Sequence, residues 1–245
     1  MSASRTSVDL QNLHHPALQT LPAAKRVLVL GGGDGLAVRE VLKYPNVQEI
    51  VSVDLDPAMT DLFKTSSILT KLNNNSLNNA RVKIVNEDTF RWLENNSEFF
   101  DAAVVDFPDS SNYALGKLYS VPFYRLLAKH IAPQGLMVIQ STSPYFAPNA
   151  FWSINATLKE TGLRTWPYHA YVPSFGEWGF IIASKSAAYQ KPERYEVTTK
   201  FLDASTTTEM FQFPKDMAQR VVEPNYLNNQ RLVRYFEEDW GRIAR

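Results

Sequence analysis

The chain has 245 residues, 44% of them hydrophobic, and its 25 basic and 25 acidic side chains give a formal net charge of zero at pH 7. This balance, without a long run of either sign, argues against a nucleic-acid-binding surface. The sequence contains no cysteine, which excludes disulfides, thiolate catalysis and cysteine-bound metals. No apolar run approaches about eighteen residues and no signal-peptide pattern is present, so we expect no membrane segment in this chain and a cytoplasmic location.

A glycine-rich turn follows the first predicted strand. Residues 27–30 are apolar at every position, which is typical of a buried parallel strand, and a helical pattern occupies residues 36–44. Between them lie four glycines, Gly31, Gly32, Gly33 and Gly35. Glycine lets the backbone turn sharply and lets a ligand approach the main chain, so we expect Gly31, Gly33 and Gly35 to form part of a ligand site.

Two acidic residues define the kind of ligand. Asp54 follows a second buried strand (49–53), about twenty residues after the turn, where a carboxylate can accept hydrogen bonds from ribose hydroxyls. Asp34 lies inside the turn and would repel a diphosphate at the helix N-terminus, which argues against NAD and ATP. It favours a nucleoside with a positive charge, such as S-adenosylmethionine and its relatives. The alternative is that Asp34 only caps the helix, which would contribute about 0.3 to 1 kcal/mol.

Asp88 lies at another junction between a strand and a helix. A helix is predicted over residues 57–72, a surface loop over 73–79, a third strand over 81–85 and the next helix over 90–95. An acidic side chain at this corner can accept a hydrogen bond from the exocyclic amine of adenine. It can also serve as the N-cap of the following helix, and the two roles are compatible.

Two further carboxylates follow the fourth predicted strand (99–106). Asp106 and Asp109 lie at its carboxyl end, where open α/β sheets bind ligands, and Pro108 between them restricts the loop. Such a pair can orient an amine nucleophile and remove its proton, so both are candidate catalytic residues. The alternative is turn chemistry, in which aspartate side chains bond their own backbone.

The remaining pattern predicts the fold class. The alternation of strands and helices continues after a loop containing residues 113–117. It predicts a helix over 121–131, a turn over 133–135, a strand over 136–140 and a helix over 148–162. Two strands, 164–172 and 178–184, are joined by so short a turn that they must be antiparallel neighbours. We therefore predict an α/β fold with a doubly wound, mostly parallel sheet and a final antiparallel pair, as in the S-adenosylmethionine-dependent methyltransferases. Tyr171, Phe175 and Glu177 should lie near its ligand-binding edge.

Together these segments resemble one known family. Their motifs are similar to those of the polyamine aminopropyltransferases, the spermidine synthase family. The motifs are the glycine turn with residues 39–42, then residues 53–56, then Phe100-Asp101 leading to Asp106-x-x-Asp109. Residues 171–180 and 201–235 resemble the bacterial branch in which such a domain follows a membrane-spanning region. The resemblance covers about residues 14–185. It suggests an N-terminal remnant or linker (1–25), a Rossmann-like catalytic domain (26–185) and a C-terminal extension packed on the same domain (186–245).

The resemblance implies an enzyme of polyamine biosynthesis. Decarboxylated S-adenosylmethionine would be a co-substrate, with no tightly bound cofactor, and a diamine such as putrescine would accept the aminopropyl group to give spermidine. The implied contacts are Asp54 with the ribose, Asp88 and Thr89 with adenine, Asp34 and Asp106 with the donor, Asp109 with the attacking amine, and Phe175 and Glu177 with the acceptor. A homodimer is one implied assembly. We expect no metal site, because adjacent His14 and His15 point in different directions on any regular element.

Three features differ from the family pattern. Little sequence precedes His14, where the family has a β-hairpin domain that closes over the ligands; Phe107-Pro108 replaces two serines; and Phe175 stands about where the family has a tyrosine. Two alternatives therefore stay open: a methyltransferase on the same fold, and a non-catalytic nucleoside- or polyamine-binding homologue.

Overall fold

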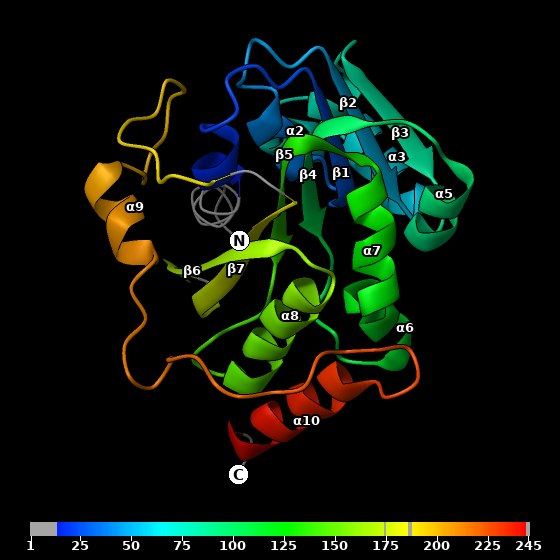
Figure 1. Cartoon of the computed structure of the whole chain (residues 1–245). Helices are drawn as coiled ribbons and strands as arrows, with labels where there is room; N and C mark the ends of the chain where they lie inside the picture. The colour runs from blue at the N-terminus through cyan, green and yellow to red at the C-terminus, as the bar shows by residue number, and fades with distance from the viewer. Residues whose placement is uncertain (1–13, 174, 186–187, 244–245) are drawn as a thin grey trace.

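The computed structural model describes residues 14–173, 175–185 and 188–243, which form a single seven-stranded sheet with helices on both faces (Figure 1). The strand order is β3-β2-β1-β4-β5-β7-β6, in which the first five strands are parallel and β7 runs antiparallel to both of its neighbours. The strands are β1 (Arg26–Gly31), β2 (Glu49–Asp54), β3 (Val82–Asn86), β4 (Phe100–Asp106), β5 (Ile131–Gln140), β6 (Arg164–Val172) and β7 (Gly176–Ser184). The predicted fold class, including the antiparallel pair, is confirmed.

The helices lie between successive strands and after the last one. They are α2 (Leu36–Val41), α3 (Pro57–Thr65), α4 (Leu69–Leu72), α5 (Thr89–Asn95), α6 (Tyr113–Gly116), α7 (Val121–Lys129), α8 (Pro148–Glu160), α9 (Ala204–Met210) and α10 (Arg231–Ile243), with 3-10 turns η1 (Ser76–Asn78) and η2 (Lys117–Tyr119). Residues 14–18 are also helical. No helix in the described ranges combines the length and apolar character that a bilayer crossing requires.

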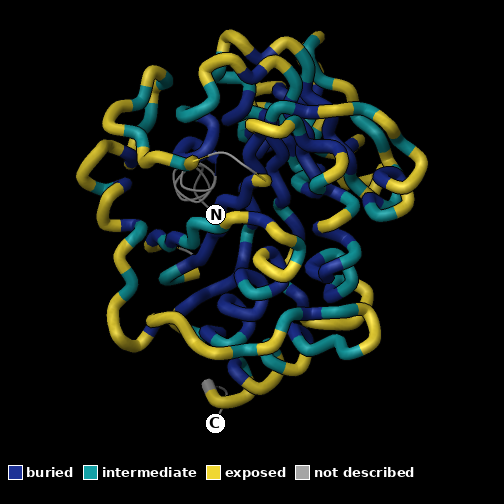
Figure 2. The backbone as a smooth tube through the Cα atoms, in the orientation of Figure 1, coloured by how far each residue is buried: buried dark blue, intermediate teal, exposed yellow. Residues whose placement is uncertain are grey.

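Two cores lie on opposite faces of the sheet because side chains alternate along each strand. In β1, Leu28 and Leu30 face a core that contains α5, α7 and α8, whereas Val27 and Val29 face the core of α2 and residues 17–18. The central strands are therefore buried on both sides, as the dark interior of Figure 2 shows. Each fully buried leucine or valine side chain stabilises the fold by about 1.5 to 3 kcal/mol. Because both faces of these strands are buried, their sequences are apolar runs without alternation, and such runs predicted the strands correctly.

Several element boundaries differ from the predictions. The helix expected over 57–72 is divided into α3 and α4, because Ser66 adopts an extended conformation (φ −68°, ψ 123°). The turn expected at 133–135 lies within β5, where the register against β4 shifts and Gly135 packs so closely that a Cβ would lie 2.6 Å from the carbonyl oxygen of Asp101. The loop expected around residues 113–117 contains α6.

Segments at both ends of the described chain pack on the sheet domain. Ala17 and Leu18, in the segment predicted to be a linker, are buried in the core beside α2. Helix α10 lies along α8 in Figure 1, and its Asp239 carboxylate accepts hydrogen bonds from the backbone N–H of Asn149 (2.8 Å) and of Ala150 (3.2 Å). The first turn of α8 has no side-chain cap of its own, so Asp239 supplies that cap.

Candidate functional site

The glycine turn between β1 and α2 is built around two close backbone approaches. Gly31 has a φ of 80°, and a Cβ there would lie 2.3 Å from the carbonyl oxygen of Asp106 at the end of β4. The N–H of Gly33 donates a 2.9 Å hydrogen bond to Oδ2 of Asp54, and a Cβ on Gly33 would lie 2.8 Å from that carboxyl carbon. The glycines therefore let three adjacent strand ends meet at one point.

A cavity of about 440 Å³ opens at this point, at the carboxyl ends of β1, β2 and β4. It is lined by Gly31, Gly32, Gly33, Asp34, Asp54, Leu55, Asp56, Met59, Asp88, Thr89, Asp106, Phe107, Pro108, Leu115, Leu118 and Gln140. Five of these described lining residues are aspartates, and none is lysine or arginine. All the predicted donor-binding residues line it except Gly35.

Gly35 has a structural position behind the cavity. It is the N-cap of α2, with a φ of 72°, and a Cβ there would lie 2.6 Å from the Leu77 side chain. The Ser76 hydroxyl donates a 2.6 Å hydrogen bond to the carbonyl oxygen of Gly35. The absence of a side chain at Gly35 thus lets η1 pack against the glycine turn.

The polar segment over 73–79 supports the same turn. We expected a surface loop here, but Asn73, Ser76 and Leu77 are buried. The Asn73 amide donates hydrogen bonds to the carbonyl oxygens of Asp34 (2.9 Å) and Phe63 (3.2 Å). A run of asparagines carries no periodic signal, so the sequence could not reveal that one of them anchors the ligand turn.

Asp34 lines the cavity and also accepts a hydrogen bond at the start of α2. Its Oδ1 accepts a 3.0 Å hydrogen bond from the N–H of Leu36. Burial raises the pKa of Asp34, and the charge of Asp54 adds to that effect, while the Leu36 N–H and Arg39 oppose it. Two carboxyl groups thus share one desolvated site, and a cationic ligand there would stabilise both charges.

Asp88 has two partners in the structure. It is the N-cap of α5, accepting from the N–H of Arg91 (3.1 Å), and its Oδ2 accepts a 2.8 Å hydrogen bond from Nζ of Lys117. Burial alone would raise the pKa of Asp88, but the bonds from Lys117 and Arg91 outweigh it and lower the pKa. Asp88 is therefore a charged acceptor at the edge of the cavity. The sequence around residues 113–117 gave no indication that Lys117 would contact Asp88.

Tyr119, which is buried in the core, holds the loop from Asp106 to Asp109 in place. The Tyr119 hydroxyl lies 3.1 Å from the carbonyl oxygens of both Phe107 and Pro108, to which it donates, and Nε2 of Gln140 donates to that of Phe107 (3.1 Å). The Phe107 ring packs edge-on against Tyr119 in the core. The Phe107 ring is therefore held by packing in the core, at the point where this residue also forms part of the cavity wall.

Asp109 lies beyond the acidic cavity. It is absent from the described lining, and burial raises its pKa to about 6, with the neighbouring Thr142 hydroxyl acting in the opposite direction. A partly desolvated carboxyl group with a pKa near neutrality is suited to proton transfer. The sequence predicted the position of Asp109 at the end of β4, but its desolvation depends on packing that no motif encodes.

The hairpin of β6 and β7 places the other two predicted acceptor residues outside the acidic cavity. Phe175 is half exposed and packs on Trp178, with ring centroids 5.2 Å apart. Oε2 of Glu177 lies 2.8 Å from Nδ1 of His169, a residue that the sequence did not single out. Burial alone would lower the pKa of His169, but the bond to Glu177 raises it.

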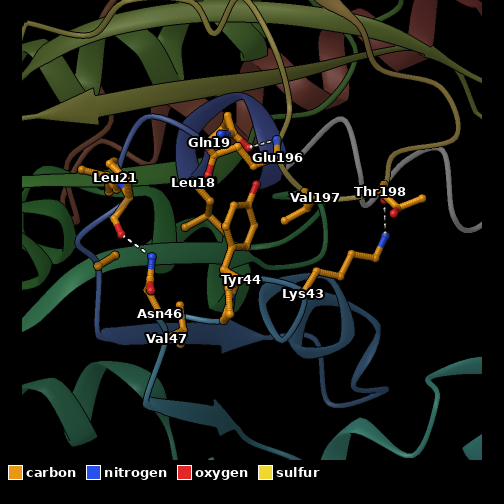
Figure 3. A pocket seen from close by; sticks show the side chains of 13 residues that line it. Leu18, Gln19, Leu21, Lys43, Tyr44, Asn46, Val47, Glu196, Val197 and Thr198 are labelled. Carbon is orange, nitrogen blue, oxygen red and sulfur yellow. Dashed lines mark hydrogen bonds between the residues drawn. The ribbon is translucent and has the colours of Figure 1, made fainter.

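A larger cavity, of about 540 Å³, lies at the opposite end of the parallel strands. Figure 3 shows Lys43, Tyr44 and Asn46 around it, facing Leu18, Gln19 and Leu21 and the segment 196–198. Nζ of Lys43 donates to the carbonyl oxygen of Thr198 (3.3 Å), and the Asn46 amide donates to that of Pro22 (2.8 Å). None of the predicted site residues lines it. We therefore place the functional site in the smaller, acidic cavity.

Within the described ranges, no group of three or more histidine, aspartate or glutamate side chains is arranged to hold a metal ion. In the segment 14–18, His15 uses both ring nitrogens inside the protein: Nε2 lies 2.9 Å from Glu40 and Nδ1 lies 2.9 Å from the Tyr44 hydroxyl.

The sequence profile of the spermine/spermidine synthase domain matches residues 9–195. Polyamine aminopropyltransferase 2 of Ralstonia nicotianae is 59% identical over 231 residues, which are 94% of this chain and 45% of that protein. The polyamine aminopropyltransferase of Leptospira interrogans is 47% identical over 233 residues, which are 95% of this chain and 47% of that protein. The chain thus spans about half the length of these curated relatives.

The fold is similar to that of a solved spermidine synthase, whose crystal structure is in complex with the transition-state analogue AdoDATO. The two structures have a TM-score of 0.77 at 18% sequence identity, and the match covers 96% of this chain and 75% of that one. At this identity the similarity concerns the arrangement of helices and strands.

Proposed function

Since this chain belongs to the spermine/spermidine synthase domain family, we propose that it transfers an aminopropyl group from decarboxylated S-adenosylmethionine to a diamine such as putrescine. The products would be spermidine and methylthioadenosine. The acidic cavity carries this proposal: its described lining has five aspartates and neither lysine nor arginine. Such a lining disfavours phosphate groups and favours a nucleoside whose tail is purely cationic.

We assign the donor to this cavity through its separate parts. Asp54, at the end of β2, would accept from the ribose hydroxyls, and Asp88 with Thr89 would contact adenine. Asp34 and Asp106 would face the sulfonium and the aminopropyl ammonium. Ordinary S-adenosylmethionine carries a carboxylate on the same tail, which would be repelled by these two aspartates.

Asp109 is the proposed general base for the acceptor. A free alkyl amine has a pKa near that of lysine, about 10.4, so it arrives protonated. Asp109, whose pKa burial raises to about 6, is a stronger base than an exposed aspartate and would take one proton from the ammonium group. The nitrogen lone pair then forms a bond to the carbon next to sulfur. The carbon–sulfur bond breaks in line, and its electron pair neutralises the sulfonium to give the thioether.

Calorimetry with the full chain tests the choice of donor. We expect decarboxylated S-adenosylmethionine to bind at least about tenfold more tightly than the carboxylated form, a difference of about 1.4 kcal/mol. Asp34→Asn keeps an acceptor for the Leu36 N–H but removes the charge, so it should reduce this preference. Asp61→Asn, on the exposed surface of α3, is the matched control and should not change it.

Product analysis with putrescine then tests the reaction. Spermidine and methylthioadenosine in equal amounts would support aminopropyl transfer. Equal or tighter binding of carboxylated S-adenosylmethionine would favour a methyltransferase, and donor binding without product would favour a binding homologue. The cytoplasmic location, the homodimer and the membrane-fused branch stay predictions from the sequence.

A further inference from the structure

Thr142, two residues after the end of β5, has an unusual backbone conformation. Its φ is 59°, in the left-handed region, and the residue is only 3% exposed. The other non-glycine residues with positive φ in the described chain are two asparagines and a glutamine, so Thr142 alone among them is β-branched. This conformation is sterically unfavourable for a β-branched residue, and such strain is concentrated at functional sites.

Strand β7 holds Thr142 in this conformation. The N–H of Gly179 donates a 2.7 Å hydrogen bond to the carbonyl oxygen of Thr142, and the N–H of Ser141 donates a 2.9 Å hydrogen bond to that of Gly179. A Cβ on Gly179 would lie 2.4 Å from the Phe151 ring and 2.7 Å from the Thr142 carbonyl oxygen. The close contact of the two backbones therefore requires glycine at 179.

The Thr142 hydroxyl is buried beside the proposed base. Among the described residues its Oγ1 has no hydrogen-bond partner of normal geometry, yet it is near enough to the Asp109 carboxyl group to counter the effect of burial on the pKa of Asp109. A buried hydroxyl without a full set of partners is costly, and it leaves an acceptor available to a group of a bound ligand.

We propose that Thr142 is a second acceptor-binding residue, whose hydroxyl receives a hydrogen bond from the amine that Asp109 deprotonates. A threonine hydroxyl can donate to the Asp109 carboxylate and still accept from the amine. Two contacts on one nitrogen fix the direction of its lone pair, which must point at the carbon next to sulfur. This inference rests on the proposed function, because it assigns a contact to the acceptor of that reaction.

Three variants of the full chain test the proposal. Thr142→Val keeps the shape and β-branching but removes the hydroxyl, and Thr142→Ser keeps the hydroxyl. Thr165→Val is the matched control, because the Thr165 hydroxyl is also buried without a partner among the described residues but lies at the start of β6, away from the donor cavity. The measurements are kcat/KM for putrescine at saturating donor, and the Kd of methylthioadenosine by calorimetry.

We expect Thr142→Val to lower kcat/KM for putrescine by at least about tenfold, the loss of a hydrogen bond to a charged group, while methylthioadenosine binding changes less than about twofold. Thr142→Ser should recover most of the activity, and Thr165→Val should behave as the wild type. If Thr142→Val is as active as the wild type, or if Thr142→Ser is equally impaired, the proposal is overturned and Thr142 has only a structural role.

Failure of the proposed function is distinguishable from failure of this inference. Calorimetry of putrescine in the presence of methylthioadenosine measures the acceptor contact without turnover. A wild type that binds putrescine but makes no spermidine would contradict the proposed function. In that case weaker putrescine binding by Thr142→Val would support this inference, and unchanged binding would overturn it. A wild type that neither binds nor converts putrescine overturns both.

Discussion

The backbone N–H of Gly33 donates a hydrogen bond of 2.9 Å to Oδ2 of Asp54, and the other carboxylate oxygen, Oδ1, accepts one of 2.9 Å from the N–H of Asp56. One side chain therefore links the turn after β1 to the end of β2. The position of the Asp54 carboxylate is set by two backbone groups and not by solvent, so it is preorganised for a ligand.

Gly33→Ala should disturb this link. A Cβ at position 33 would lie 2.8 Å from the carboxyl carbon of Asp54, so the side chain must move away from both backbone donors. We expect a stability loss of about 1 to 3 kcal/mol, typical of overpacking, and at least about tenfold weaker methylthioadenosine binding. Gly241→Ala is the control: nothing lies within 4 Å of a Cβ there, and alanine in α10 should stabilise by about 0.5 to 1 kcal/mol. Unchanged ligand affinity in Gly33→Ala would contradict the role of the link.

Asp88→Asn should reduce discrimination by the adenine site. Asparagine is also a good N-cap, so α5 keeps its first turn. We expect the wild type to bind methylthioadenosine at least about tenfold more tightly than methylthioinosine, whose carbonyl replaces the exocyclic amine, and Asp88→Asn to lose most of that difference. Calorimetry with both nucleosides measures it. Glu87→Gln, next in sequence but outside the described cavity lining, should keep the preference; equal preference in both variants would exclude Asp88 as the adenine acceptor.

Asp109 should set the acidic limb of the pH profile. Its pKa is raised to about 6, so transfer should increase as the pH rises through about 6 and the carboxylate forms. Asp109→Asn should abolish transfer while methylthioadenosine binding changes less than about twofold, because Asp109 lies outside the cavity to which we assign the donor. A rate measurement with putrescine at several pH values checks both expectations, and an active Asp109→Asn would remove this residue from the mechanism.

The same raised pKa has a consequence for stability. The folded chain holds the proton of Asp109 more tightly than the unfolded chain does, because the unfolded value is near 3.8. This contribution to the free energy of unfolding is therefore present below about pH 4 and is lost as the pH rises through about 6. Asp109→Asn should remove this part of the pH dependence, which urea unfolding at pH 4 and pH 7 would measure.

Glu40 should show the opposite pH dependence. Burial alone would raise its pKa, but hydrogen bonds from His15 and Lys43 lower it to about 2. Its contribution is thus present above about pH 4.5 and is lost as the pH falls through about 2. Replacing the carboxylate in Glu40→Gln should cost about 3 kcal/mol near neutral pH. Glu49→Gln, whose partner Arg26 is partly exposed, should cost less than about 1 kcal/mol, and equal losses in urea unfolding would contradict the role of burial.

The sequence predicted the structure best where a hydrophobic pattern repeats, or where a residue type such as glycine indicates one kind of local structure. Residues 27–30 and the glycines after them predicted a buried strand and a tight turn, and the structure has both. That the turn binds a ligand stays a prediction. Position at the end of a strand also predicted that Asp54 and Asp106 would lie at the ligand-binding edge of the sheet, because parallel strands end at one edge, and both line the cavity there. These inferences need only local sequence and the rules of sheet topology.

The remaining features depend on contacts between distant segments. The Asn73 amide reaches the carbonyl oxygen of Asp34 across 39 residues, and Lys117 reaches Asp88 across 29. The φ of Thr142 is set by its bonds to β7 and not by its neighbours in sequence. Each of these side chains is unremarkable in its own stretch of the chain, so only the folded structure reveals its role.

Capping of α8 by Asp239 has a consequence for biosynthesis. Asp239 follows Asn149 by 90 residues, so α8 emerges from the ribosome long before the carboxylate that satisfies its first turn. At ordinary elongation rates of about 5 to 20 residues per second, this interval lasts several seconds. During that time the surface of α8 that packs against α10 stays exposed, and exposed apolar surface of this kind is prone to aggregation until residues 231–243 dock.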